Sequence, residues 1–491
     1  MTASWIVFII ASCVLIGVGA WSNLKIKKAS ASGDSGEGFL LGAKQVGAFI
    51  GAGTLMATGY SGWGFIGSPG TAYAYGTIEI LANFFYAPGI VFGTLWFANY
   101  MRKQAEKHGG LTVPEYLAVT HRGTHNQRRV VHFFAGLATF VFLSVYMIGQ
   151  IRAVGLVASE WLGISEELSS IMLMLIIVIF TMQGGLLAVA VTDTIMCVGM
   201  VIAAIFVFVY IVKDVSIVEL FARVGEMNPE FLNPTTSIPY GDGQYSVFLV
   251  FVYALLFTIT LPYMSVRFLS LKEDIKVHRM SMLMAIIGVI LSLIPFVGIY
   301  MYYENPGGLA NPDSAMPVFL NNYMPPGLTA IITLFILFAM LSTISSVLQS
   351  LAAALSYDMF VSIANRNSKY GDLFNRLAVV ITAILGMFLT YVAPQGMLNQ
   401  IAYIGTGGLI ASFVGPTVMH VFVEADLRTC FVSMLVGFIA NIVLAFGTDA
   451  GWVEAPIIAG LAGAIVYFVM GYVTNGMCCK VEEVKPSENI T

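Results

Sequence analysis

The sequence predicts an all-α, polytopic membrane protein with about 13 transmembrane helices. Of its 491 residues, 58% are hydrophobic and only 10% are charged, which leaves too little polar surface for an ordinary soluble protein. Apolar runs long enough to cross about 30 Å of hydrocarbon recur along the chain. They lie at residues 3–22, 42–66, 74–100, 130–158, 166–185, 187–212, 243–265, 280–303, 326–357, 377–393, 397–422, 429–447 and 455–476.

The positions of the basic residues predict how these helices are oriented. With the N-terminus outside and an odd number of spans, all of the 23 Lys and Arg residues except Arg152, Lys213 and Arg223 fall in cytoplasmic segments or at their edges. Basic residues gather on the cytoplasmic side of membrane proteins. We therefore expect a multi-pass protein of the plasma (inner) membrane, with its N-terminus outside and its C-terminus in the cytoplasm. This orientation makes Arg267 a cytoplasmic residue.

The first apolar run is expected to remain in the protein as an anchoring helix. Its basic cluster, residues 25–28, follows the apolar residues, whereas a cleavable signal carries basic residues before them.

The second run contains a segment that is a poor helix former. Five glycines lie between Gly51 and Gly64, and each costs about 1 kcal/mol relative to Ala inside a helix. We expect the helix to break here, because non-helical backbone at membrane depth frees carbonyl groups that can coordinate a cation. Close packing of helices through small residues is the alternative, but it does not account for Tyr60, Ser61 and Trp63 at the same depth.

The seventh run is interrupted in a similar way. Pro262 removes a backbone donor, and Thr258 and Thr260 lie just before it. Paired interruptions in corresponding spans are typical of an inverted repeat with its substrate site near the bilayer midplane. The sequence thus predicts an N-terminal extra helix (1–30), a first five-helix repeat (40–213), a second five-helix repeat (243–422), two additional C-terminal helices (428–476) and a cytoplasmic tail (477–491).

The ninth run carries a cluster of hydroxyl groups. Ser342, Thr343 and Ser346 stand at positions i+3, i+4 and i+7 from Ala339 and so share one helix face, with Ser345 beside them. Such a face can ligate a small hard cation. A single Ser or Thr usually bonds to its own backbone or to a neighbouring helix instead, but four clustered hydroxyls together with a broken helix favour ion binding.

Several short motifs follow one another in chain order. They are Gly42-Ala43-Lys44, Ser61-Gly62-Trp63 with Gly67-Ser68-Pro69-Gly70, Gly184 to Val189 with Thr192-Asp193, Leu261-Pro262 with Val266-Arg267, and Ala339 to Ser346. Together they resemble the sodium/solute symporter family, in particular its sodium/pantothenate and sodium/proline symporters. The resemblance implies a leucine-transporter-type fold, a 5+5 inverted repeat with broken helices, and sodium-driven uptake by alternating access.

The resemblance also implies where sodium binds. The family's common site falls on the backbone carbonyls of Ala57, Tyr60 and Ala339 and on the hydroxyls of Ser342 and Thr343. All five ligands are neutral oxygens, which suit a hard monovalent ion that must also leave. A possible second sodium site falls on Asp193 with Ser342, Ser345 and Ser346. An acidic residue inside a span is functional by default, although Asp193 near the inner face is alternatively solvated or part of a proton or ion exit path.

For the substrate, the resemblance implies contacts from the second, fourth, seventh and eleventh spans. The candidates are Ser61, Gly62, Trp63, Tyr146, Gln150, Thr258 and Tyr403. The Ser61-Gly62-Trp63 triplet and Tyr146 are similar to the sodium/proline symporters, but Ala254 and Thr258 stand where those carriers have an aromatic pair. The segment 261–280 and the residues 324–326 are more similar to the sodium/pantothenate symporters.

The predicted function is sodium-coupled symport of a small organic solute that contains a carboxylate, such as pantothenate, a monocarboxylate or a proline-like compound. The expected partners are this solute, sodium ions and the lipid bilayer, without nucleic acid, and a monomer is expected to suffice. A proton-coupled carrier or a nutrient sensor with a transporter fold is the alternative. A channel would need polar rings along a continuous pore, and an enzyme would need a catalytic cluster that the six histidines do not form.

Overall fold

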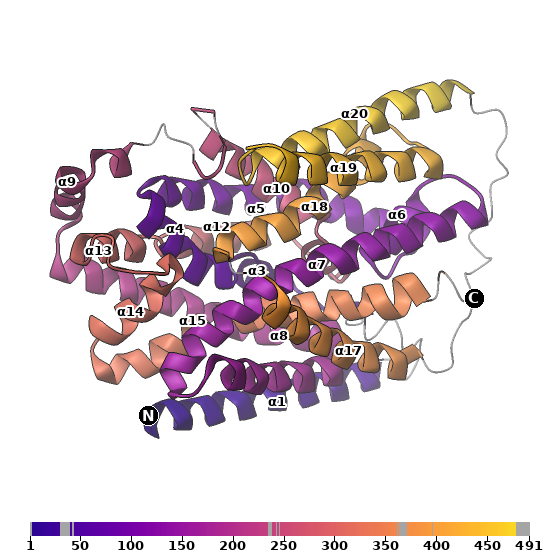
Figure 1. Cartoon of the computed structure of the whole chain (residues 1–491). Helices are drawn as coiled ribbons and strands as arrows, with labels where there is room; N and C mark the ends of the chain where they lie inside the picture. Colours follow the sequence, from indigo (N-terminus) through magenta and orange to yellow (C-terminus); the bar gives the residue numbers. More distant parts are fainter. Residues whose placement is uncertain are drawn as a thin grey trace.

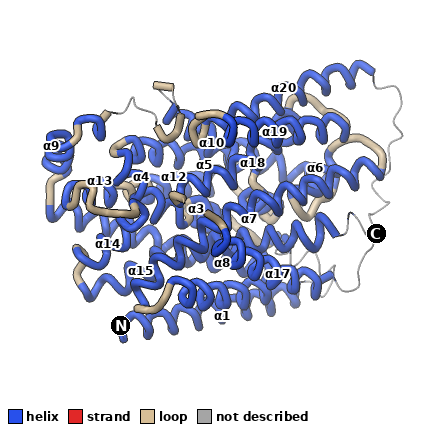
Figure 2. The backbone as a smooth tube through the Cα atoms, viewed as in Figure 1, coloured by secondary structure: helices blue, strands red, loops and turns tan. Residues whose placement is uncertain are grey.

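The computed structural model describes residues 2–29, 40–41, 44–233, 238–241, 243–244, 246–360, 362, 371–394 and 396–477. Within these ranges the chain is helical apart from two isolated bridges and the connecting loops, and the helices run side by side as one bundle (Figures 1 and 2). Gly42 and Ala43, and the predicted tail from residue 478 onward, lie outside the described ranges.

Helical elements follow one another along the whole described chain. In order they are α1 (Thr2–Ala29), α3 (Ala48–Gly59), η3 (Trp63–Gly67), α4 (Ser68–Tyr75), α5 (Ile78–His108), α6 (Val113–Thr120), α7 (His125–Leu162), α8 (Glu166–Asp214), α9 (Ile217–Met227), η4 (Pro229–Leu232), η5 (Ser246–Phe248), α10 (Leu249–Thr260), α11 (Pro262–Leu269), α12 (Val277–Leu291), α13 (Phe296–Glu304), η6 (Pro312–Ser314), α14 (Ala315–Asn322), α15 (Pro326–Ala353), η7 (Ala354–Met359), α17 (Gly371–Val392), α18 (Leu398–Val418), η8 (Met419–Val421), α19 (Leu427–Gly447) and α20 (Glu454–Met477).

Ten helices in the described ranges are long and apolar enough to cross a membrane, or 11 when the bent pair α10 and α11 counts as one span. The predicted count of about 13 differs in two places. Helix α8 joins two predicted spans in one element of 49 residues, and α3 has only 12 residues, which is too short to cross by itself. The apolar segments are therefore the same, and the difference is in how they are divided.

Helix α8 contains a kink between its two predicted spans. Gly185 has φ 50° and ψ −148°, a conformation that a residue with a Cβ adopts only under strain. The kink divides a helix that would otherwise be about 74 Å long, more than twice the thickness of the hydrocarbon core.

The predicted break in the second span is present. Helix α3 ends at Gly59, and Tyr60 leaves the helical conformation with φ −92° and ψ 68°. The chain then forms a π-helical turn from Trp63 to Gly67 before α4 continues. Helix α3 contacts α8, α12 and α15, so this irregular backbone is enclosed by protein, as irregular backbone at membrane depth must be.

The predicted interruption in the seventh span is also present. Helix α10 ends at Thr260, Leu261 is extended, and Pro262 opens α11. The two helices are bent by 56°. Pro262 occupies a position where its missing N–H is not needed, which explains why the chain restarts a helix there.

The first and last helices lie at opposite edges of the bundle (Figure 1). Helix α1 contacts α8, whereas α19 and α20 contact each other and α18. The central helices α3, α10, α15 and α18 lie between these edges and hold the candidate site.

Candidate functional site

Helix α15 presents two hydroxyl groups to the broken end of α3. The Ser342 hydroxyl donates to the Ala57 carbonyl oxygen at 3.1 Å, and the Thr343 hydroxyl donates to the Thr58 carbonyl oxygen at 3.3 Å. Both hydroxyls also donate to the Ala339 carbonyl oxygen, at 3.0 and 3.2 Å. The structure therefore brings together Ala57, Ala339, Ser342 and Thr343, which the family resemblance assigned to one predicted cation site.

Tyr60 lies at the end of this oxygen cluster. Its non-helical backbone takes its carbonyl group out of the regular ladder of α3. Its phenol hydroxyl lies 2.8 Å from the hydroxyl of Ser292, the residue that follows α12. The side chain thus anchors the break to Ser292, and the backbone carbonyl oxygen of Tyr60 is available as a ligand.

Asp193 from α8 forms a second, charged cluster one turn away along α3. Its Oδ2 accepts hydrogen bonds from the hydroxyls of Thr54 (2.7 Å), Thr58 (3.2 Å) and Ser346 (3.3 Å). Its Oδ1 has no hydrogen-bond partner among the described residues. Ser345 donates instead to the Ser342 carbonyl oxygen at 2.9 Å, so Ser346 is the serine that reaches the acid.

Arg267 from α11 is the counterion of Asp193. Its Nη2 lies 2.9 Å from Asp193 Oδ2 and 2.6 Å from the Ser346 hydroxyl. Both side chains are fully buried. Arg267 is therefore not a solvated residue of a connecting loop, because its guanidinium group is enclosed between α3, α8 and α15 and pairs with the carboxylate of Asp193. The side of the membrane on which it lies stays a prediction.

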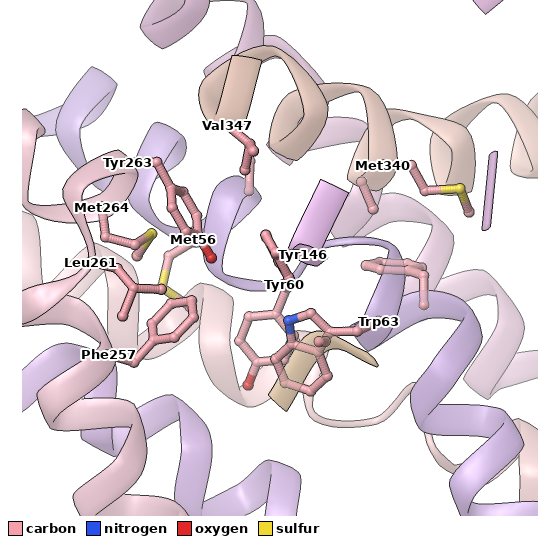
Figure 3. Packing of buried hydrophobic residues seen from close by; sticks show 14 of the residues in the cluster. Met56, Tyr60, Trp63, Tyr146, Phe257, Leu261, Tyr263, Met264, Met340 and Val347 are labelled. Carbon is pink, nitrogen blue, oxygen red and sulfur yellow. The ribbon is translucent and has the colours of Figure 1, made fainter. Parts of the chain in front are cut away.

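A pocket lies beside the break, and Trp63, three residues after Tyr60, is one of its lining residues. Eight residues line it, and the cavity between them has a volume of about 10 Å³, roughly the space that one water molecule needs. The eight residues come from η3, α5, α7, α10 and α18, and they are Trp63, Tyr86, Tyr146, Tyr253, Phe257, Ala402, Tyr403 and Thr406. Figure 3 shows Tyr60, Trp63 and Tyr146 gathered at the break, with Phe257 on the neighbouring α10. The rings nearly fill the site in this conformation, so an organic solute enters only when they move apart.

Polar contacts hold the wall of this pocket in place. The Ser61 hydroxyl lies 2.9 Å from the Tyr146 hydroxyl, and the Gly62 N–H donates to Gln150 Oε1 at 3.0 Å. A Cβ atom on Gly62 would lie 2.9 Å from Gln150 Oε1 and 3.0 Å from Met340 Cγ. Gly62 is therefore required for the close approach of the break to α7 and α15.

The predicted substrate residues separate into three groups. Trp63, Tyr146 and Tyr403 line the pocket, and Ser61, Gly62 and Gln150 support that lining. Thr258 is outside the lining and donates to the Ala254 carbonyl oxygen of its own helix at 2.8 Å.

Helix α10 nevertheless contributes aromatic rings, which the sequence reasoning missed. Tyr253 and Phe257 line the pocket, one position before Ala254 and Thr258, where the aromatic pair was judged to be replaced. Their i,i+4 spacing places them on one helix face, and this spacing is the signal that was available. Tyr86 also lines the pocket, and no comparable spacing in the sequence indicated it.

A comparison with family models finds that the one described as the sodium:solute symporter family matches residues 39–437. The sodium/proline symporter 2 of Staphylococcus saprophyticus is 25% identical over 427 residues, covering 84% of this chain and 81% of the relative. The high-affinity proline transporter of Bacillus subtilis is 26% identical, covering 78% and 80%. The sodium/pantothenate symporter of Escherichia coli is 25% identical over 451 residues, covering 88% and 89%.

Solved structures share the fold. A substrate-bound, outward-open sodium-coupled sialic acid symporter matches with a TM-score of 0.76 at 21% identity, covering 98% of this chain and 99% of that chain. Mhp1, a transporter of the nucleobase-cation-symport-1 family, matches with a TM-score of 0.55 at 14% identity, covering 87% and 93%. The predicted fold class, a leucine-transporter-type arrangement of membrane helices, is confirmed.

Proposed function

The chain belongs to the sodium:solute symporter family, and from this premise we propose that it imports a small organic solute together with sodium by alternating access. It is a multi-pass membrane transporter and not an enzyme. The observation that carries the proposal is the meeting of the Ser342 and Thr343 hydroxyls with carbonyls at the end of α3. A neutral oxygen cluster of this kind, between two helices at a break, is suited to a monovalent cation.

We assign the transported sodium ion to the carbonyl oxygens of Ala57, Tyr60 and Ala339 and the hydroxyls of Ser342 and Thr343. The two hydroxyls can rotate their hydrogens away and offer lone pairs to the ion. Bound there, sodium would tie the end of α3 to α15. Each ion moved inward gains about 2.3 kcal/mol per 100 mV of membrane potential.

The pocket beside the break is the proposed substrate site, with Ser61, Gly62, Trp63, Tyr146, Gln150 and Tyr403 as its predicted residues. Thr258 remains a predicted substrate contact, although it is outside the lining of the pocket. Three residues of the break, Ser61 to Trp63, follow directly on the proposed sodium ligand Tyr60. Because the same backbone segment serves both ligands, each is expected to raise the affinity for the other by an equal factor.

Sodium coupling is tested by uptake into proteoliposomes of fixed lipid composition. An inward sodium gradient should drive accumulation of the solute, and an equal potassium gradient should not. A sodium ionophore should abolish the accumulation, whereas a proton uncoupler should leave it intact. Accumulation that follows the proton gradient alone would instead establish the proton-coupled alternative, and binding without uptake would establish the sensor.

We further propose that Asp193, Ser345 and Ser346 hold a second sodium ion, with the Oδ1 of Asp193, which has no partner among the described residues, as its charged ligand. Ser345→Ala is the most specific test, because the Ser345 hydroxyl donates to the Ser342 carbonyl oxygen and leaves the pairing of Asp193 with Arg267 untouched. We expect the variant to transport one sodium ion per solute where the unmodified protein transports two. Reversal potentials in proteoliposomes give this ratio, and a ratio of one in both proteins would exclude the second site.

A further inference from the structure

The pocket is walled by aromatic rings, and none of its eight lining residues is charged. We call six of these residues, Trp63, Tyr86, Tyr146, Tyr253, Phe257 and Tyr403, the aromatic cage. The two pairs of rings with the shortest centroid distances meet at steep angles within it. Trp63 and Tyr86 have centroids 4.7 Å apart at 84°, and Tyr253 and Tyr403 have centroids 4.9 Å apart at 67°. Rings set in this way pack edge to face, and both pairs belong to the lining of the pocket.

The aromatic cage discriminates between solutes by charge. The face of an aromatic ring is negative, so a cationic nitrogen in contact with several faces is stabilised, and aromatic cages recognise alkylated ammonium groups for this reason. A carboxylate gains nothing from the same faces. A neutral alkyl group gains only its burial.

A buried carboxyl group behind the cage would act in the same direction in its ionised form. Glu79 of α5 is fully buried and accepts hydrogen bonds from Ser68 (2.5 Å), Asn83 (2.8 Å) and the Tyr240 hydroxyl. No Lys, Arg or His among the described residues forms an ion pair with it. The Tyr240 ring in turn lies 6.0 Å from the Tyr403 ring at 81°. Glu79 is thus one side chain removed from the cage.

We propose that the solute carries an alkylated ammonium group, and that the aromatic cage binds this group while Glu79 adds negative potential from behind. This inference rests on the proposed function of the pocket as the substrate site. It narrows the solute to betaines, in which a quaternary ammonium group accompanies a carboxylate. Compounds without a cationic nitrogen, such as pantothenate and simple monocarboxylates, are excluded as the main substrate.

The test compares glycine betaine with 3,3-dimethylbutanoate, in which a carbon atom replaces the charged nitrogen at the same shape. The melting temperature of the purified protein is measured with each compound, and with pantothenate, in sodium and in potassium buffer. We expect glycine betaine to raise the melting temperature in sodium only, and the carbon isostere and pantothenate to have no effect at equal concentration.

Two positions connect the effect to the cage. Tyr403→Phe keeps the ring and should retain the affinity for glycine betaine within about threefold, whereas Tyr403→Leu removes the ring and should weaken it by about tenfold or more. Glu79→Gln keeps a side chain of the same shape without the charge and should also lower the affinity for glycine betaine. In all three variants, stabilisation by sodium alone should match that of the unmodified protein, which shows that the fold is intact.

The outcomes of this test separate the two proposals. Equal stabilisation by the carbon isostere, preferential stabilisation by pantothenate, or no stabilisation by glycine betaine would overturn the ammonium proposal and leave sodium symport standing. Stabilisation by glycine betaine that is the same in potassium as in sodium would support the cage but contradict sodium coupling.

Discussion

Replacing Ser342 and Thr343 together by Ala is expected to raise the sodium concentration for half-maximal uptake by about tenfold or more, which corresponds to at least about 1.4 kcal/mol of binding free energy. The variant removes two of the five proposed ligand oxygens and leaves only backbone carbonyls to replace the hydration shell of the ion. The maximal rate at saturating sodium should fall much less than the affinity. Initial rates of solute uptake over a range of sodium concentrations measure both quantities.

The control for this double variant is Ser412→Ala with Thr382→Ala. These two side chains are also buried, but they donate to carbonyls of their own helices, Ser412 to Gly408 at 2.8 Å and Thr382 to Ala378 at 2.7 Å. The control also removes one Ser and one Thr hydroxyl from the membrane domain and should leave the sodium dependence unchanged. An equal shift in both double variants would show that the effect comes from general loosening of the bundle.

Replacing Arg267 by Ala is expected to destabilise the protein by about 3–5 kcal/mol, because it leaves the buried carboxylate of Asp193 without its counterion. The loss should appear as a large drop in melting temperature. It should be partly recovered in the double variant Arg267→Met with Asp193→Leu, in which neither charge remains to be compensated. Thermal unfolding of the purified proteins in one detergent gives the comparison.

Arg223→Ala is the matched control for this prediction. Arg223 also pairs with an acid, Glu219, at 3.3 Å, but the two side chains are 58% and 50% exposed. An exposed pair contributes about 1 kcal/mol or less, so this variant should melt close to the unmodified protein. If the melting temperature of Arg267→Ala were as close to that of the unmodified protein as the melting temperature of Arg223→Ala is, the ion pair with Asp193 would not contribute to stability.

The breaks in the helices could be predicted because their causes are local. The glycines between Gly51 and Gly64 and the ring of Pro262 weaken a helix wherever it is placed, and the structure has its breaks at Tyr60 and Leu261. The hydroxyl face of α15 could be predicted for the same reason, since the spacing of Ser342 and Thr343 fixes their relation within one helix.

The contacts between helices could not be read from such local rules. Arg267 and Asp193 are separated by 74 residues, and their pairing depends on how α8 and α11 are rotated about their axes. The i,i+4 spacing of Tyr253 and Phe257 places both rings on one face of α10, but it does not say which face is turned to the pocket. A shift of one position turns a side chain by about 100° around a helix, so Tyr253 and Phe257 line the pocket where Ala254 and Thr258 do not. Tertiary packing decides such rotations.

The most direct test of the central claim is sodium binding without any solute. The melting temperature of the purified protein is followed as sodium replaces potassium at constant ionic strength, for the unmodified protein and for the Ser342→Ala, Thr343→Ala double variant. At 100 times the dissociation constant, a bound ion adds about 2.7 kcal/mol of stability. We predict that sodium raises the melting temperature of the unmodified protein and that the double variant requires far more sodium for the same rise. Identical sodium dependence in the two proteins would contradict the assignment of the ion to the break in α3 and the hydroxyls of α15.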